Sequence, residues 1–168
     1  MNKIYWTHFI HHEWKLYMAA TENGLCYVGS PNKPYEEMEK WLTKRFPKYK
    51  LEENPKALEL YIIEIKEYLD GDRSEFTLPV ELKGTAFQLA IWDALTKIPY
   101  GEKKSYSQIA EFINNSAAIR AVGAAIGANP VLITIPCHRV VAKNGSLTGY
   151  RGGLEMKEKL LTLEKGEQ

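Results

Sequence analysis

Hydrophobic positions along the first part of the chain alternate in short runs and then recur at helical spacing. Apolar residues dominate 14–21 and 25–28, and Asn23-Gly24 between these runs is a dipeptide that favours a tight hairpin turn. Two paired strands are therefore predicted there. Segment 34–46 is predicted to be a helix, because one proline stands in its first turn and another follows its end.

An apolar stripe marks a second helix over 56–69. Its members recur every third or fourth residue: Leu58, Tyr61, Ile62, Ile65 and Leu69. Gly71 follows, where a glycine commonly ends a helix. Apolar residues then alternate with polar ones over 76–82, which is typical of a strand with one buried face. Residues 1–83 are thus predicted to form a small α/β domain with a three-stranded sheet and helices, and they show no evident catalytic cluster.

Beyond Lys83-Gly84, the predicted domain boundary, the pattern changes to short amphipathic helices. Helices over 85–97 and 105–113 each begin with a capping box, in which Thr or Ser is followed three residues later by Gln. A polar break separates the second of these helices from a third, and two short helices joined in this way predict a helix-turn-helix. Residues 84–168 are therefore expected to form a mostly helical domain, and the chain as a whole an α+β protein.

The third helix of this domain, expected from a Ser116 cap to about Gly127, has two contrasting faces. Three residues should pack inward: Ile119, Val122 and Ile126. Another face joins one long cation to small residues: Arg120, Gly123, Ala124 and Gly127. A glycine inside a helix costs about 1 kcal/mol relative to alanine, so the small face needs an explanation. The pattern alone favours tight helix packing, and it leaves open close approach to a nucleic-acid groove with Arg120 probing it.

Charge and hydropathy narrow the class of protein. The chain has 168 residues, 45% of them hydrophobic, and a net charge of +1. Basic residues exceed acidic ones ten to seven from Thr85 onward, which permits DNA binding through a few phosphate contacts without demanding it. No apolar run reaches the roughly 18 residues that a membrane span needs, and the first residues lack a signal-peptide pattern. A cytoplasmic protein with no membrane partner is expected.

Cysteine and histidine usage argues against a metal site. The two cysteines, Cys26 and Cys137, are too few for a disulfide scaffold or a four-cysteine zinc site. A bridge between them is formally open, but a reducing compartment favours free thiols, and Cys26 is interpreted as a core residue of a strand. His11-His12 could suggest metal binding. No partner cysteine or suitable histidine spacing supports it, so a solvated strand or loop is the better interpretation, and no metal is predicted.

The segment Ile135–Val141 is the strongest candidate for chemistry, because it places a histidine and an arginine directly after a cysteine. A neighbouring imidazole or cation is the usual means of lowering a thiol pKa. The apolar run 131–135 before it predicts a buried strand, and adjacent side chains of a strand point to opposite sides. Contact between Cys137 and His138 would then need a turn or a bridging water. From this segment alone, a catalytic thiol and a structural one are equally open.

A wider set of spaced motifs resolves this ambiguity. In order, the chain contains Gly84-Thr85-x-Phe87-Gln88-x-x-x-Trp92, Ile98-Pro99-x-Gly101, Ser105-Tyr106, Arg120-Ala121-Val122-Gly123, Asn129-Pro130, Pro136-Cys137-His138-Arg139-Val140, Gly149-Tyr150-x-Gly152-Gly153 and Leu160-Leu161-x-x-Glu164. Together these closely resemble the O6-alkylguanine-DNA alkyltransferases, also called methylated-DNA–protein-cysteine methyltransferases. The resemblance is strong over residues 84–164 and weak over the N-terminal part.

The resemblance implies a role for each matching catalytic position. Cys137 would accept the alkyl group, and His138 would be its general base, acting through a water. Glu164 would hold the other imidazole nitrogen and so fix the tautomer. Asn129 would tie the helix-turn-helix to the active-site segment by hydrogen bonds. Tyr106 would contact the target nucleotide and supply a proton to the departing guanine.

The resemblance also implies how DNA is held. Arg120 would enter the base stack in place of a flipped nucleotide, since an alkylated base must leave the helix to meet a buried thiolate. The second helix of the helix-turn-helix would lie in the minor groove, which suits its small face at Gly123, Ala124 and Gly127. Arg139 is a further expected DNA contact. The base pocket would be lined by Val140, Tyr150 and Arg151.

The expected activity is DNA repair by irreversible, single-turnover transfer of the alkyl group from O6-alkylguanine in double-stranded DNA to Cys137, by a monomer without a cofactor. Whether O4-methylthymine and larger alkyl groups are accepted stays open. Two other classes compete with this one. Alkyltransferase-like binding proteins carry tryptophan at the acceptor position, so Cys137 argues against that class. A helix-turn-helix transcription factor fits the near-neutral charge poorly, and a cysteine hydrolase lacks a recognisable oxyanion site.

Overall fold

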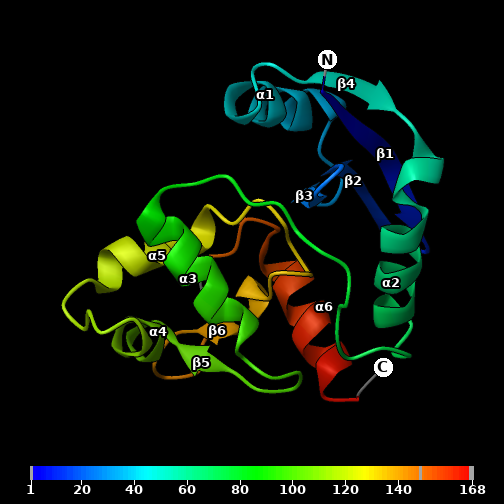
Figure 1. The fold of residues 1–168 in the computed structure, drawn as a ribbon. Coiled ribbons are helices and arrows are strands. Elements are labelled where there is room, and N and C mark those ends of the chain that lie inside the picture. Colours follow the sequence, from blue (N-terminus) through cyan, green and yellow to red (C-terminus); the bar gives the residue numbers. More distant parts are fainter. Residues whose placement is uncertain (1, 148, 167–168) are drawn as a thin grey trace. The chain divides into compact units, whose positions relative to one another are not determined.

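The computed structural model describes residues 2–147 and 149–166, and the chain divides into two compact units, residues 1–83 and 84–168. Figure 1 shows strands and helices in the first unit and mostly helices in the second. The predicted α+β class is therefore confirmed. Within the described part of the chain, no helix has the length and apolar character needed to cross a membrane.

The first unit is built on one sheet of four strands in the order β3-β2-β1-β4. The strands are β1 (Lys3–His11), β2 (Trp14–Thr21), β3 (Gly24–Val28) and β4 (Lys50–Glu53). β2 pairs antiparallel with β1 and β3, whereas β1 and β4 run parallel. The predicted β2–β3 hairpin is confirmed, but the prediction of three strands is wrong, because β1 and β4 were missed. β1 lacks strict alternation of buried and exposed residues, and β4 is short and polar.

Two helices accompany this sheet. α1 (Tyr35–Arg45) and α2 (Glu59–Leu69), the latter preceded by the short 3₁₀ helix η1 (Pro55–Leu58), match the predicted helical segments. α1 contributes Met38 and Leu42 to the core of the unit. The other buried members of that core are Ile4, Ala19, Cys26, Tyr27 and Phe46. Cys26 is fully buried there, and its Sγ donates to Ala19 O over 3.5 Å, as suits a structural thiol.

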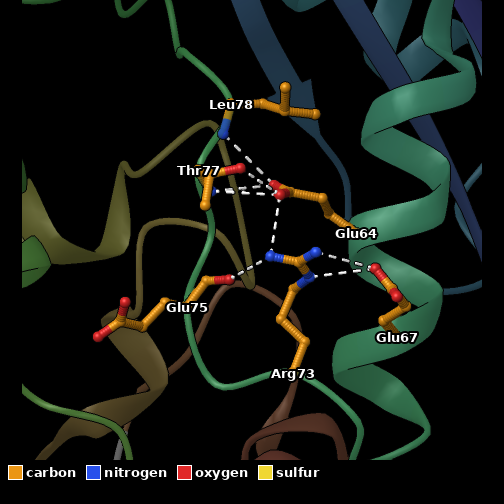
Figure 2. A network of polar contacts seen from close by, with 6 residues as sticks. All are labelled: Glu64, Glu67, Arg73, Glu75, Thr77 and Leu78. Carbon is orange, nitrogen blue, oxygen red and sulfur yellow. Dashed lines mark hydrogen bonds and ion pairs between the residues drawn. The ribbon is translucent and has the colours of Figure 1, made fainter.

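The strand predicted over 76–82 does not form. Its sole sheet contact is a bridge from Val80 to Leu25, and a buried carboxylate replaces the missing partner strand. Figure 2 shows Glu64 of α2 accepting hydrogen bonds from the backbone N–H groups of Thr77 and Leu78. Arg73 pairs with the same carboxylate over 3.0 Å and with Glu67. The alternating apolar residues are half-buried. The first part of the segment's backbone is bound by the Glu64 side chain, whereas Pro79 and Glu81 bond to the backbone of a strand residue, Leu25.

In the second unit, α3 (Ala86–Thr96), α4 (Tyr106–Phe112) and α5 (Ile119–Gly127) form the predicted helices. Both predicted capping boxes are present, at Thr85 with Gln88 and at Ser105 with Gln108. α3 is fixed on α5 by Trp92, whose ring N–H donates to Ala125 O over 2.8 Å. α4 and α5, joined by a short turn, give the helix-turn-helix (Figure 1).

Two details of α5 differ from the prediction. Ser116 does not cap it, because the helix begins at Ile119 after Ala118, which provides no side-chain cap. Ile119 is 45% exposed rather than packed inward, whereas Val122 and Ile126 are buried as predicted. The late start places Ile119 in the first turn of the helix, where the preceding chain leaves it uncovered.

The rest of the second unit carries the Cys-His-Arg segment. Val131, Leu132, Ile133 and Ile135 are buried, but residues 132–134 form a turn rather than the predicted strand, and Ile133 takes a φ of 70°. A 3₁₀ helix, η2 (Cys137–Arg139), leads into β6 (Val140–Val141), which pairs parallel with β5 (Lys104–Ser105). α6 (Leu154–Glu164) follows. Because β5 ends at the cap of α4, this pairing joins the active-site segment directly to the helix-turn-helix.

Candidate active site and DNA-binding surface

Cys137 lies in η2 with a side chain held by Asn129. The residue is 2% exposed, and Asn129 Nδ2 donates to its Sγ over 3.1 Å. The same amide group donates to Ile135 O over 2.9 Å, while its Oδ1 accepts from Val131 N over 3.0 Å. Asn129 follows the end of α5, so one buried amide connects the helix-turn-helix to the thiol. The family resemblance implied hydrogen bonds from Asn129 to the active-site segment, and the structure contains them.

Competing influences act on the Cys137 thiol. Burial raises its pKa, because a thiolate is poorly solvated in the interior. The hydrogen bond from Asn129 and the positive charges of Arg151 and Lys157 oppose this effect and lower the pKa. Burial is the largest of these influences, so the thiol is neutral at rest. A base must therefore remove the thiol proton before the sulfur can attack an alkyl group.

The carboxylate of Glu164, at the end of α6, binds both residues that follow the cysteine. His138 Nε2 donates to Oε2 over 2.7 Å. Arg139 donates from Nε to Oε1 over 2.8 Å and from Nη2 to Oε2 over 2.9 Å. Gly101 N adds a bond of 3.2 Å to Oε1. The side chains of His138, Arg139 and Glu164 are all buried. Their hydrogen bonds therefore hold η2 in a fixed position relative to α6.

The environment of His138 suits a general base. Burial lowers its pKa, and the bond to Glu164 only partly offsets that effect. The imidazole is therefore neutral near pH 7. Because Nε2 donates its proton to Glu164, Nδ1 is the basic nitrogen of this tautomer. Any proton relay from Cys137 would run through Nδ1.

The predicted DNA contact of Arg139 does not fit its position. The residue is 7% exposed, and its guanidinium is committed to Glu164 and, through Nη1, to Ile98 O over 2.7 Å. The ion pair and its hydrogen bonds offset part of the cost of removing both charges from water. Arg139 is thus part of the support of the active-site segment rather than of its outer surface.

Lys157 of α6 was not singled out from the sequence. The residue is 1% exposed, and its ammonium lies 6.0 Å from the ring centre of Tyr150. Burial lowers the pKa of Lys157, and its charge favours the Cys137 thiolate. Lys157 and Glu164 are seven residues apart and so share one face of the helix. This spacing from Glu164 was the sequence signal that could have identified Lys157 as a residue of the site.

The expected pocket residues surround the same segment. Val140 is fully buried in β6, whereas Tyr150 and Arg151 are half-buried. Arg151 Nε donates to Asn129 O over 2.9 Å, which brings this cation beside the residue that holds the thiol. The charge of Arg151 therefore acts on the Cys137 thiol, and its expected place at the edge of a base pocket stays a prediction.

The small face of α5 is open. Arg120, Ala124 and Gly127 are exposed, and Gly123 is half-buried. A Cβ added at Gly127 would meet nothing within 4 Å, and one at Gly123 would meet only Tyr106 Cδ1, at 3.9 Å. Internal packing therefore requires glycine at neither position. The explanation favoured by the sequence pattern, tight helix packing, is not supported within this chain.

Comparison with known proteins agrees with this geometry. Residues 86–166 match the family described as 6-O-methylguanine DNA methyltransferase, DNA binding domain, and residues 4–82 match its ribonuclease-like domain. The inducible methylated-DNA–protein-cysteine methyltransferase of Bacillus subtilis is 61% identical over 96% of this chain and 90% of its own length. That of Haemophilus influenzae is 37% identical over 98% of this chain and 88% of its own.

Solved structures show the same fold. The O6-methylguanine methyltransferase of Mycobacterium tuberculosis has a TM-score of 0.82 at 34% identity, over 100% of this chain and 95% of that one. A structure of the M. tuberculosis protein in complex with DNA has a TM-score of 0.79 at 34% identity, over 96% and 93%. A buried thiol beside a helix-turn-helix, in this fold, defines a DNA alkyltransferase. The chain belongs to the 6-O-methylguanine DNA methyltransferase family.

Proposed function

We propose that this protein repairs O6-alkylguanine in double-stranded DNA by moving the alkyl group to Cys137, once per molecule. Membership of the family supports the reaction class. The observation that carries the assignment of residues is a buried thiol held by the Asn129 amide, in the same short 3₁₀ helix as a buried histidine that is paired with Glu164. We also propose the cytoplasmic location that is expected from the sequence.

The transfer is a displacement at the alkyl carbon. His138 Nδ1 takes the thiol proton through a water, and Cys137 Sγ attacks the carbon attached to O6 of guanine. The S–C bond forms as the O6–C bond breaks, and Tyr106 gives the departing guanine a proton. The neutral imidazole and the Asn129 bond both favour this step, because one accepts the proton and the other stabilises the thiolate.

The product explains the single turnover. S-Alkylcysteine is a thioether without a leaving group, so nothing in the site reverses the transfer. The alkyl donor is the lesion itself, and the reaction therefore needs no methyl-donor cofactor. Lys157 and Arg151 favour the thiolate before transfer, and that stabilisation ends when the sulfur becomes neutral.

DNA would dock on the exposed small face of α5. Gly123, Ala124 and Gly127 allow the helix backbone to approach the floor of a narrow groove, and Arg120 projects from the same face. Because the thiol is buried, the damaged nucleotide must leave the base stack to reach it. Arg120 would occupy the vacated space. Because Asn129 follows α5 and is hydrogen-bonded to Cys137, it would fix the position of the thiol relative to the docked helix.

Stoichiometry tests the proposal. A duplex containing one O6-methylguanine is mixed with increasing amounts of protein, and restored guanine is counted. We expect one guanine restored per protein molecule, with no further turnover. Cys137→Ser should restore none, and Cys26→Ser, which changes the other buried thiol, should match the unaltered protein. Lesion binding without repair by the unaltered protein would instead assign it to the alkyltransferase-like binding proteins.

A further inference from the structure

Two histidines and an aspartate meet on the first unit, far in sequence from the alkyl-transfer residues. His11 ends β1, His12 follows in the turn to β2, and Asp70 stands at the end of α2. Asp70 Oδ1 accepts from His11 Nε2 over 2.7 Å and lies 3.8 Å from His12 Nε2. The sequence pattern offered no third ligand for the histidine pair, because the aspartate is 59 residues from His11.

The spacing of these atoms suits one small cation. The three ligand atoms lie within 4.8 Å of one another, and the two imidazole rings are 4.4 Å apart between centres. Ligand atoms at zinc distances in a tetrahedral site are about 3.3 Å apart, a value between the two measured separations. Water would complete the coordination. The His11 side chain is 16% exposed and that of His12 71%, so the group is anchored on one side and open to solvent on the other.

Local backbone and charge also favour a cation here. His12 has a φ of 54°, a left-handed conformation that glycine or asparagine adopts more readily than histidine. Asp70 is the C-terminal cap of α2, and the carbonyl end of a helix carries partial negative charge. The hydrogen bond between His11 and Asp70 does not explain why the turn position has a histidine, His12, instead of glycine or asparagine.

We propose that His11, His12 and Asp70 bind one divalent transition-metal ion of the zinc type. Two imidazoles and one carboxylate are a donor set that zinc accepts. The ion would clamp the β1–β2 turn to the end of α2 and so stabilise the first unit. The site lies within the first unit and shares no residue with the proposed alkyl-transfer site, so its test is independent of the proposed alkyl transfer.

Metal titration tests the proposal. Full-length protein freed of metal with a chelator is titrated with Zn²⁺ by calorimetry, and with Co²⁺ in the visible spectrum. We expect one ion per chain, a cobalt spectrum of tetrahedral intensity and a higher melting temperature with zinc. His12→Asn, which tolerates the positive φ, and Asp70→Asn should each weaken binding by more than about tenfold.

Two control variants separate this site from other ligands. His8→Asn alters another histidine of β1, whose ring stacks on Tyr17, and should leave zinc affinity unchanged. Cys137→Ser should also retain the ion, and the cobalt spectrum should lack a thiolate charge-transfer band. The proposal is overturned if the unaltered protein binds no zinc, if Asp70→Asn binds as tightly, or if Cys137→Ser abolishes binding.

Discussion

The side-chain amide of Asn129 lies 3.1 Å from Cys137 Sγ and donates a hydrogen bond to it. This relationship joins the end of α5, the helix proposed to dock on DNA, to the sulfur that is proposed to react. Because the amide also holds Ile135 O, the backbone before the cysteine and the sulfur itself are positioned by one group. In the proposed function, the docking of α5 on DNA and the activation of the thiol are therefore connected through Asn129.

Replacing Asn129 with alanine should slow methyl transfer by about 10- to 100-fold. A hydrogen bond to a charged group contributes about 1.5–3 kcal/mol, and here it favours the thiolate. Its loss raises the pKa of Cys137. The transfer rate of the variant should therefore increase more strongly than that of the unaltered protein as the pH is raised above neutrality. Single-turnover rates measured across a pH series check this. A slower variant with an unchanged pH profile would mean that Asn129 only positions the backbone.

The transfer rate should fall in acid with a midpoint below about pH 6.5, the ordinary pKa of histidine. Burial lowers the pKa of His138, so the neutral, basic imidazole persists to a lower pH than in a free peptide. The rate should therefore be level at the acid side of neutrality and decline below it. Rapid-quench measurement of methyl transfer gives the midpoint. A midpoint above that of free histidine would contradict a neutral buried base.

Arg139→Met should lower stability and leave DNA affinity unchanged, whereas Arg120→Met should lower DNA affinity and leave stability nearly unchanged. Loss of buried Arg139 leaves the Glu164 carboxylate without its ion pair and should destabilise the protein by about 3–5 kcal/mol. Duplex affinity, measured below the melting temperature, should hardly change. Loss of exposed Arg120 should alter stability by about 0.5 kcal/mol or less and weaken DNA binding. Denaturant unfolding and fluorescence anisotropy give the two quantities, and a DNA-binding defect specific to Arg139→Met would restore the original prediction.

Gly123→Ala should make the protein more stable but a weaker DNA binder. Alanine stabilises a helix interior by about 1 kcal/mol relative to glycine, and the added methyl group meets only Tyr106 at contact distance. The same methyl group would hold α5 away from the groove. Ala121→Gly, at another exposed position of α5, is the matched control and should lose stability while keeping affinity. Equal DNA affinity of Gly123→Ala and the unaltered protein would argue against docking through the small face.

Local signals in the sequence predicted most of the helices and one hairpin. The capping boxes at Thr85 and Ser105 form as predicted, because a few adjacent residues determine them. The β2–β3 hairpin also forms, but its two-residue loop is Glu22-Asn23 rather than the predicted Asn23-Gly24, since Gly24 already pairs with Thr21. The strand expected over 76–82 failed for a nonlocal reason. Glu64 of α2 binds the backbone of Thr77, and no pattern within the segment reports a carboxylate 13 residues away.

The candidate site shows the same division. Family motifs pointed to Cys137, His138, Glu164 and Asn129, and the structure pairs Asn129 with Cys137 and His138 with Glu164. The motifs did not show that Arg139 is buried whereas Arg120 is exposed. The burial of Arg139 depends on its ion pair with Glu164, which is 25 residues away in the sequence. Lys157 was missed because a lysine on a charged helix is typical of a solvated face. Its burial depends on how α6 packs.

The most direct test of the central claim traces the methyl group. A duplex carrying O6-methylguanine with a fully deuterated methyl group is incubated with the protein until repair is complete, and the digested protein is examined by tandem mass spectrometry. The account predicts that every transferred label lies on the sulfur of Cys137, at one label per chain, with none on Cys26. Label on another residue, or repaired DNA with an unlabelled Cys137, would contradict it.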